Sequence, residues 1–255
     1  MRIPKIIHYC WFGGNEMPND IKSNISKWKE MLPDYEFICW DEKNFSIDYN
    51  EYVSQAYKAK KYAFVSDVAR IYALYTYGGF YLDTDIEIKR SFDTLLDKSN
   101  LILGYENYNE HVMTAFIGAE KENKYIKKLL DTYENDRFVL EDGKINDVAN
   151  PIRLTKLLKA EGIKVPFNEI ITSDICVYKE EMFSAMRFYD MVEISTAETY
   201  TVHHFKSSWK PWYVKLRRKI KIFIFKIIYR KNYKKWLVPY FVRYCICFLF
   251  SLMWF

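Results

Sequence analysis

The sequence predicts an α/β fold, because apolar, strand-like runs alternate with helix-like segments along most of the chain. The composition agrees: half of the 255 residues are hydrophobic and 18% are aromatic, enough for a sizeable core. A third observation is the stretch from Gly78 to Glu87, where a glycine pair leads into an apolar run that ends in Asp83 and Asp85. Open α/β sheets bind ligands at the carboxyl ends of their strands, so this pair marks the expected site.

The first expected unit consists of a strand, a helix and a second strand. Residues 3–12 form a short apolar run closed by Gly13-Gly14, which predicts a buried strand and a turn. Residues 18–31 carry apolar side chains at helical spacing, and Pro33-Asp34 separates them from a strand expected over 35–40. The three segments predict a βαβ-like unit.

The middle of the chain predicts further elements in alternation. Residues 51–77 have the pattern of one long helical stretch that ends at Gly78-Gly79. A strand expected over 80–88 follows and carries the Asp pair near its carboxyl end. The remaining expectations are strands over 101–105 and 114–118 and helices over 123–133 and 151–161.

Charge divides the chain into two parts. The net charge is +5, but no Asp or Glu follows Glu198, and 12 of the 38 Lys and Arg residues lie between Lys210 and Arg243. Before Lys210, 26 basic residues stand against 33 acidic ones, a net charge of −7. We therefore expect one domain over residues 1–210 and a separate basic tail over residues 211–255.

The tail has the pattern of a basic amphipathic helix, with apolar residues at helical spacing at Tyr213, Leu216, Ile220, Phe223 and Ile227. Aromatic residues between the basic ones favour an anionic lipid surface as partner, and no nucleic acid. Residues 236–255 are mostly apolar, but Pro239 and Arg243 interrupt them, and the uncharged run from Tyr244 has only 12 residues. Spanning a bilayer takes about 20 residues, so a helix lying in the interface is favoured over one that crosses the membrane.

The cysteines and the N-terminus indicate a cytoplasmic environment. The five cysteines form no Cys-x-x-Cys pair and their number is odd, which is typical of reduced, packed thiols. Charged residues interrupt the N-terminus before a signal-length apolar run develops, so no cleaved signal peptide is expected. With the basic tail, this predicts a peripheral or monotopic protein on the cytoplasmic face of the cell membrane.

Two pairs of charged residues carry the expected chemistry. On an extended segment, side chains two residues apart point the same way, so Asp83 and Asp85 are expected to converge on one hard cation. The alternative is a solvated turn. Asp67 and Arg70 lie on one face of the expected helix, and the alternative for them is a surface ion pair of little energetic value.

Four ordered stretches together resemble one family: residues 4–14 (PKIIHYCWFGG), 66–70 (SDVAR), 78–85 (GGFYLDTD) and 203–209 (HHFKSSW). The chain resembles the family 32 glycosyltransferases of the sugar-binding DXD type. That family includes bacterial capsule and lipopolysaccharide sugar transferases and yeast-type mannosyltransferases. The chain is similar, more distantly, to the glucosyltransferase domains of large clostridial toxins. The resemblance covers roughly residues 3–209.

The resemblance implies a GT-A (Rossmann-like) nucleotide-sugar-binding fold and a divalent metal, Mn²⁺ or Mg²⁺, that holds the diphosphate of a UDP- or GDP-hexose. Carboxylates are suitable ligands for such a hard cation. By motif, Asp85 would bind the metal directly, and Asp83 would lie near the metal, the ribose and the sugar. Asp67 and Arg70 would contact the donor sugar and the diphosphate, which makes these four the expected catalytic residues.

The same resemblance assigns the remaining site residues. Trp11 would stack on the nucleotide base, although it could also be a core residue at the end of a strand. In the C-terminal motif, His204 and Ser207 would complete the metal site, and Ser207 and Trp209 would contact the donor. The toxins have a carboxylate where this chain has His204, so His203 and His204 both remain candidate ligands.

The function implied is a retaining, metal-dependent glycosyltransferase that moves a hexose from a nucleotide-sugar to a surface glycan, such as capsule, lipopolysaccharide or another lipid-linked acceptor. One alternative is a non-catalytic membrane-surface protein that keeps the fold and binds only sugar or nucleotide. Another is a metal-dependent phosphoesterase, but a two-metal site would need more ligands than a chain with four His offers easily.

Overall fold

The computed structural model describes residues 2–188, residues 191–206 and six residues between 213 and 222. The chain divides into two units, Met1–Lys210 and Pro211–Phe255. In the second unit the described residues are helical: Tyr213, Leu216, Arg217, Lys219, Ile220 and Ile222. The rest of the expected amphipathic helix, and the apolar run from residue 236, lie outside the described residues. No helix among the described residues is long and apolar enough to cross a membrane.

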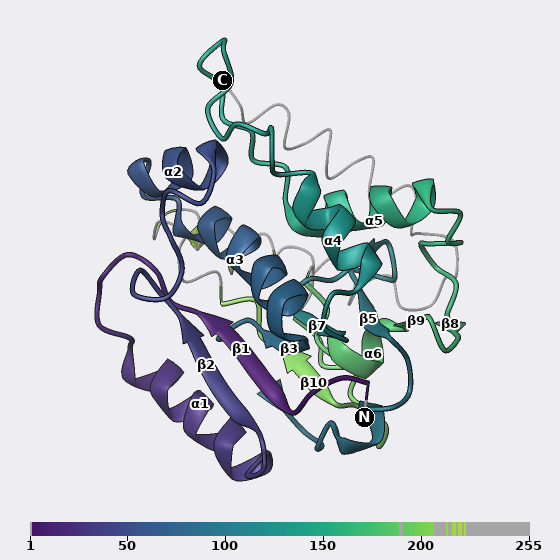
Figure 1. Ribbon diagram of the computed structural model, residues 1–255. Helices are drawn as coiled ribbons and strands as arrows, with labels where there is room; N and C mark the ends of the chain where they lie inside the picture. Colours follow the sequence, from purple (N-terminus) through teal and green to yellow (C-terminus); the bar gives the residue numbers. More distant parts are fainter. Residues whose placement is uncertain are drawn as a thin grey trace. The chain divides into compact units, whose positions relative to one another are not determined.

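The first unit contains a mixed eight-stranded sheet between layers of helices, which confirms the α/β class (Figure 1). The strand order is β2-β1-β3-β7-β5-β9-β8, with β6 paired to β5, and β4 and β10 form a separate two-stranded sheet. The strands are β1 (Ile6–Cys10), β2 (Glu36–Trp40), β3 (Gly79–Leu82), β4 (Ile86–Ile88), β5 (Leu101–Glu106), β6 (His111–Val112), β7 (Phe116–Ala119), β8 (Ile170–Ile171), β9 (Ile175–Tyr178) and β10 (Thr201–His203). The helices are α1 (Asn19–Met31), α2 (Glu51–Lys58), α3 (Tyr62–Tyr77), α4 (Lys124–Asp131), α5 (Asn150–Ala160) and α6 (Glu180–Phe183), with a 3₁₀ turn at Asp93–Leu95.

Alternation along the strands divides the core between the two faces of the sheet. On β3, Phe80 and Leu82 pack into the cluster that contains α1 and α6 residues, whereas Tyr81 packs with α2, α3, α4 and α5. In Figure 1, α1 and α3 accordingly lie on opposite sides of β1. The predicted βαβ unit is confirmed, because β1 and β2 are parallel neighbours joined through α1.

The long helix expected over residues 51–77 is instead two helices. The chain adopts a left-handed conformation at Lys60 (φ 55°), and the Lys61 amide donates to the Ala56 carbonyl oxygen at 2.9 Å. This hydrogen bond is typical of a helix end that is followed by a left-handed residue, and that residue is usually glycine. A lysine occupies it here, which is why the sequence pattern did not predict the break.

The single strand expected over residues 80–88 is also wrong. β3 ends at Leu82, and the amide of Ile86 donates to the Asp83 carbonyl oxygen at 3.0 Å, closing a turn. β4 then leaves the main sheet and pairs antiparallel with β10. Asp83 and Asp85 therefore belong to a turn rather than sharing one face of a strand.

The glycine pair before β3 has a steric cause. Gly78 and Gly79 both have positive φ, 68° and 103°. A Cβ atom on Gly79 would lie 2.5 Å from the Ile6 carbonyl oxygen, and one on Gly78 would lie 2.7 Å from the Lys121 nitrogen. Only glycine lets the backbone take this shape and approach so closely.

His8 fixes the entry to β3 from the neighbouring strand. Its side chain is fully buried, and its Nε2 lies 2.8 Å from the Gly78 carbonyl oxygen. The Trp40 indole, which can only donate, lies 3.1 Å from His8 Nδ1. Nδ1 is therefore the acceptor and Nε2 carries the proton, so the ring is neutral.

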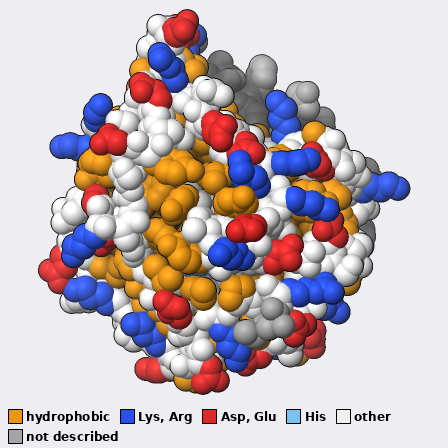
Figure 2. Space-filling view, viewed as in Figure 1, with side chains coloured by type: hydrophobic (Ala, Val, Ile, Leu, Met, Phe, Trp, Pro, Cys, Tyr) orange, Lys and Arg blue, Asp and Glu red, His pale blue; other side chains and the backbone are white. Residues whose placement is uncertain are grey.

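Aromatic side chains cover this histidine. Figure 2 shows hydrophobic side chains gathered on the face in view, and Tyr49 and Tyr77 remain 39% and 44% exposed. Trp40 packs against Tyr77 and Tyr72 with ring centroids 5.7 and 5.8 Å apart. The Tyr77 ring lies 6.2 Å from the His8 ring, so part of the high aromatic content serves to bury His8.

We expect acid to destabilise the fold through His8. Burial lowers the pKa of His8 from 6.5 to about 4, and the bond to Gly78 offsets this only in part. Because the folded pKa is depressed, the contribution of neutral His8 is complete above pH 6.5 and is lost as the pH falls toward 4. At about 1.4 kcal/mol per pH unit, the contribution is about 3 kcal/mol.

Urea unfolding of wild type and His8→Asn at pH 7 and pH 4 measures this contribution. The difference in unfolding free energy between the two proteins should shrink by about 3 kcal/mol on acidification. The partly exposed His111, replaced by Asn, serves as the matched control. A difference that is the same at both pH values would contradict the assignment.

Candidate active site

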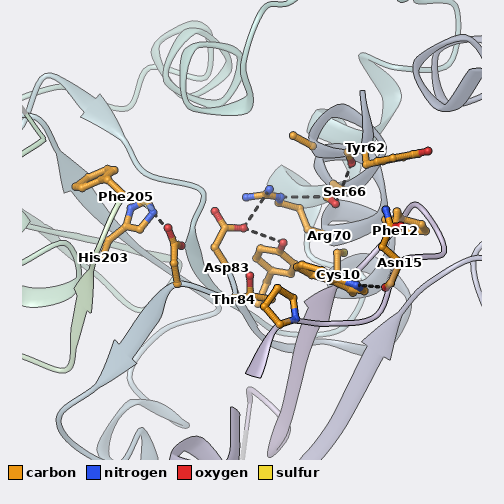
Figure 3. A pocket seen from close by; sticks show the side chains of 15 residues that line it. Cys10, Phe12, Asn15, Tyr62, Ser66, Arg70, Asp83, Thr84, His203 and Phe205 are labelled. Carbon is orange, nitrogen blue, oxygen red and sulfur yellow. Dashed lines mark hydrogen bonds and ion pairs between the residues drawn. The ribbon is translucent and has the colours of Figure 1, made fainter. Parts of the chain in front are cut away.

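Four of the expected site residues, Trp11, Arg70, Asp83 and Asp85, line one cavity of about 440 Å³ in the first unit. Its walls come from the end of β1, the first half of α3, the turn after β3 and the end of β10. In Figure 3 the side chains of Arg70, Asp83 and His203 point toward the same space. The lining residues are Cys10, Trp11, Phe12, Asn15, Pro18, Tyr62, Ala63, Ser66, Arg70, Tyr81, Asp83, Thr84, Asp85, His203 and Phe205.

Asp83 is held through one of its two carboxylate oxygens. Its Oδ1 accepts a hydrogen bond from the Tyr81 hydroxyl at 2.9 Å and lies 3.2 Å from Arg70 Nη2. Among the described residues, no hydrogen bond or ion pair reaches Oδ2. The carboxylate is therefore oriented by its neighbours and keeps one oxygen for a ligand, as Figure 3 shows.

Asp85 is anchored by the segment that follows β10. Its Oδ2 accepts from the Lys206 amide at 2.7 Å, and its Oδ1 lies 3.3 Å from His203 Nε2. Burial alone would raise the pKa of Asp85, but the charge of His203 and these hydrogen bonds lower it to about 2. Asp85 is therefore ionised at neutral pH.

The structure brings His203, and not His204, to the Asp pair. Oxygen and nitrogen atoms of Asp83, Asp85 and His203 lie within 4.8 Å of one another, close enough to hold one metal ion. His204 Nε2 instead lies 2.8 Å from a carboxylate oxygen of Glu87. Successive side chains of an extended segment point to opposite sides, so only one of the two histidines can reach the pair. Of the two candidate histidines, His203 is thus the one beside the Asp pair, whereas His204, which was expected in the metal site, contacts Glu87.

Arg70 and Asp67 form a buried ion pair, which excludes the alternative that they pair on the protein surface. The Arg70 side chain is only 7% exposed, and its Nη2 lies 3.1 Å from Asp67 and 3.2 Å from Asp83. Its other nitrogens donate to the Thr114 carbonyl oxygen at 2.7 Å and the Ser66 carbonyl oxygen at 3.3 Å. The planar guanidinium of Arg70 thus links α3 to the turn of residues 83–86, which contains Asp83 and Asp85 and is called the DXD turn below.

Asp67 does not line the cavity, but its carboxylate contacts Arg70, which does. Burial raises the pKa of Asp67 to about 6, and the charge of Arg70 lowers it in part. The Asn150 amide donates to the Asp67 carbonyl oxygen at 2.8 Å, and the Tyr133 hydroxyl bonds to Asn150 at 2.6 Å. Asn150 therefore supports Asp67 from α5, a role that the sequence alone did not predict.

The remaining expected residues divide into two groups. Trp11 lines the cavity, is partly exposed, and donates from its indole nitrogen to the Asn15 carbonyl oxygen at 2.8 Å. Its indole is thus fixed at the wall of the cavity rather than enclosed in the core. Ser207 and Trp209 lie outside the described residues.

Two contacts of the DXD turn were missed in the sequence. Tyr81 orients Asp83 from two residues away on β3, a spacing that places both side chains on one face and could have been noticed. Asn24 on α1 donates to the carbonyl oxygens of Thr84 and Ile86 at 3.1 and 2.7 Å. No local pattern links Asn24 to a turn 60 residues away.

Comparison with known proteins agrees with this arrangement. Residues 18–102 match the family model described as "Glycosyltransferase sugar-binding region containing DXD motif". The resemblance to this family is thus confirmed over this region, which contains two of the four stretches, residues 66–70 and 78–85. The matched region includes nine of the fifteen residues that line the cavity, among them Arg70, Asp83 and Asp85.

Several relatives of the chain are named as glycosyltransferases. Inositol phosphoceramide mannosyltransferase 3 of Schizosaccharomyces pombe is 36% identical over 102 residues, which covers 37% of this chain and 27% of that protein. The uncharacterized glycosyltransferase L373 of Acanthamoeba polyphaga mimivirus is 25% identical over 222 residues, with 82% of this chain and 84% of that protein covered. The solved structure of the PaToxG glycosyltransferase has a TM-score of 0.45 and 22% identity, and the match covers 62% of this chain and 69% of that one. The chain spans about a quarter to two fifths of the length of the first curated relatives it matches.

Proposed function

We propose that the chain is a retaining, metal-dependent glycosyltransferase that moves a hexose from a UDP- or GDP-linked donor to a glycan or lipid-linked acceptor. One observation carries the proposal: the carboxylates of Asp83 and Asp85 and the imidazole of His203 converge at a cavity that Arg70 also lines. The position of this cluster, at the end of β3, is where α/β sheets hold ligands. The family match over residues 18–102 supports the same chemistry.

The residues present fit a divalent metal. Asp83, Asp85 and His203 offer two carboxylates and one imidazole, a donor set suited to Mn²⁺ and acceptable for Mg²⁺. Asp83 Oδ2 is the oxygen that its neighbours leave available. A bound metal would supply positive charge for the diphosphate of the donor. Without it, the raised pKa of His203 and the lowered pKa of Asp85 describe an ion pair that holds the two ligands together.

The chain's own residues supply position and charge. Arg70 aligns Asp83 and remains positive beside the place where the leaving diphosphate gains charge. Trp11 lines the cavity and offers an indole surface for the nucleotide base. The cavity volume of about 440 Å³ lies within the range of small-molecule sites. Hexose transfer to a lipid-linked acceptor is favoured because several relatives are named as mannosyltransferases of inositol phosphoceramide.

Nucleotide release from a panel of donors tests the function. The purified chain is incubated with GDP-mannose, UDP-glucose and UDP-galactose, with Mn²⁺ or with EDTA, and free GDP or UDP is measured. We expect release from one donor class, only with metal. Binding without release would indicate the non-catalytic alternative, and release of inorganic phosphate in place of a nucleoside diphosphate would indicate the phosphoesterase.

We expect the basic tail to hold the protein on an anionic membrane surface. Each Lys or Arg close to such a surface contributes about 1 kcal/mol, and residues 211–255 contain 11 of them and no acidic residue. Salt weakens this attraction, whereas burial of the aromatic run from Trp236 resists salt. The full chain should therefore sediment with phosphatidylserine-containing vesicles even in 1 M salt.

Truncation after Lys210 is the matched comparison for the tail. The shortened protein should remain in the supernatant and still release nucleotide from the donor. Sedimentation of the truncated protein, or failure of the full chain to bind vesicles at low salt, would contradict the membrane assignment.

A further inference from the structure

A second cavity, of about 310 Å³, adjoins the active-site cavity, because Asp85 lines both of them. Aromatic side chains such as Trp11 and Tyr62 line the active-site cavity, whereas every residue that lines the second cavity has a polar side chain. These residues are Asp20, Ser23, Asn24, Lys27, Asp85, Glu87, His204 and Lys206. The second cavity is therefore rich in hydrogen-bonding groups and offers no side chain for stacking a base or packing an acyl chain.

The sequence builds this cavity from helical spacing on α1 and from alternation on β4. α1 buries Ile21, Ile25 and Trp28 on one face, and its four lining residues recur at helical spacing on another. The Trp28 indole nitrogen donates to the Ile86 carbonyl oxygen at 2.9 Å, which holds α1 against β4. Glu87 is the middle residue of β4, and both of its neighbours are buried. Its side chain accordingly points away from the core and lines the cavity.

The segment after β10 divides its side chains between the two cavities. His203 and Phe205 line the active-site cavity, whereas His204 and Lys206 line the second cavity. Ligands in the two cavities would therefore be held by neighbouring residues of one segment, next to Asp85. A transfer reaction needs this relation, because its two reacting molecules must be held in contact.

The charged groups of the second cavity are held in place by one another. Glu87 Oε2 lies 2.8 Å from His204 Nε2, and Glu87 Oε1 lies 2.8 Å from Lys89 Nζ. Lys206 Nζ lies 2.7 Å from a carboxylate oxygen of Asp20, which links α1 to the segment after β10. The Glu87 side chain remains 39% exposed. Since each carboxylate oxygen can accept more than one hydrogen bond, Glu87 can accept from a ligand hydroxyl and keep both partners.

We propose that the second cavity binds the acceptor, through hydroxyl groups of a neutral sugar or cyclic polyol that hydrogen-bond to Glu87, His204 and Lys27. This inference rests on the proposed function. A hydroxyl both donates and accepts, so it matches a lining that mixes carboxylates with lysines. Three carboxylates stand against two lysines, which disfavours a phosphate group as the ligand. Among the described residues, the group that can hold a metal shares only Asp85 with this lining.

Ser23→Trp tests the proposal by filling the second cavity. Ser23 is exposed on α1 and lines this cavity but not the active-site cavity. The preferred donor and Mn²⁺ are supplied with one of four probes: methyl α-mannoside, methyl α-glucoside, methyl β-galactoside or myo-inositol. Glycosylated probe is measured by mass spectrometry, and donor affinity by calorimetry. Transfer at a given probe concentration should fall about tenfold or more, the scale of a lost hydrogen bond to a charged group, while donor affinity stays unchanged.

Ser26→Trp is the matched control, since Ser26 is exposed on the same helix but lines neither cavity. Both replacements have the same effect on helix propensity, so Ser26→Trp should match wild type in transfer and in donor affinity. Glu87→Gln tests the hydrogen bonding itself, because it keeps the size of the side chain and removes its charge. Its KM for the probe should rise about tenfold with donor affinity retained.

Each other outcome overturns a specific statement. Transfer at the wild-type rate in folded Ser23→Trp would show that the second cavity is a solvated surface. Loss of donor affinity in Ser23→Trp would assign the cavity to the donor. An unchanged KM in Glu87→Gln would remove Glu87 from acceptor binding. A wild type that releases nucleotide but glycosylates none of the four probes would overturn the neutral hydroxyl acceptor, and one that releases no nucleotide from any donor would overturn the proposed function itself.

Discussion

Replacing Asp85 with Asn is expected to abolish metal-dependent nucleotide release while the chain stays folded. The amide keeps an oxygen that can accept from the Lys206 amide, so the segment after β10 retains this anchor. The charge that attracts a divalent cation and pairs with His203 is lost. We expect a loss of turnover on the order of a hundredfold to a thousandfold, the scale of removing one preorganised electrostatic contact. Turnover as a function of Mn²⁺ concentration measures the loss.

Asp20→Asn is the control for Asp85→Asn. Asp20 pairs with the Lys206 side chain at 2.7 Å, close to the same segment, but it is mostly exposed and is not among the possible metal ligands. Its replacement should leave the Mn²⁺ dependence unchanged. Metal-independent turnover at the wild-type rate in Asp85→Asn would remove the DXD pair from the mechanism.

Local periodicity was sufficient to predict most of the fold. Apolar runs and helical spacing placed β1, α1, β2, β5, β7, α4 and α5 within a few residues of their observed bounds. The fold around the DXD pair was harder to predict. β9 pairs with β5 in the main sheet, whereas β10 pairs with β4 in the separate two-stranded sheet. Neither strand was predicted. Short strands with distant partners carry little local signal.

The sequence predicted which residues lie at the candidate site, but it did not predict the contacts between them. The spacing of Asp83 and Asp85 indicated one shared ligand, yet the reason given was wrong, because a turn and not a strand brings the pair together. Burial also could not be deduced from an i, i+3 spacing: the Asp67–Arg70 pair has the pattern of a surface ion pair and lies in the interior.

The structure gives Arg70→Lys a larger expected effect than loss of a phosphate contact alone. The guanidinium reaches Asp67, Asp83 and the Thr114 carbonyl oxygen at once. A lysine keeps the charge but offers one nitrogen, which cannot occupy the separate positions of Nη1 and Nη2. Asp83 would then be oriented by Tyr81 alone among its present partners. We expect turnover to fall about a hundredfold, with a smaller change in KM for the donor.

Arg153→Lys separates this effect from the general cost of replacing a buried arginine. Arg153 is 12% exposed in its side chain, pairs with Asp136 at 2.6 Å and lies over the Tyr133 ring, but it does not line the cavity. Its replacement should lower stability and leave turnover per folded molecule close to wild type. Arg70→Lys should differ by losing turnover even where it is fully folded, as judged by circular dichroism. Equal turnover in Arg70→Lys and Arg153→Lys would show that Arg70 only supports the fold. If Arg70 aligns Asp83 for the reaction, loss of its guanidinium must lower the rate.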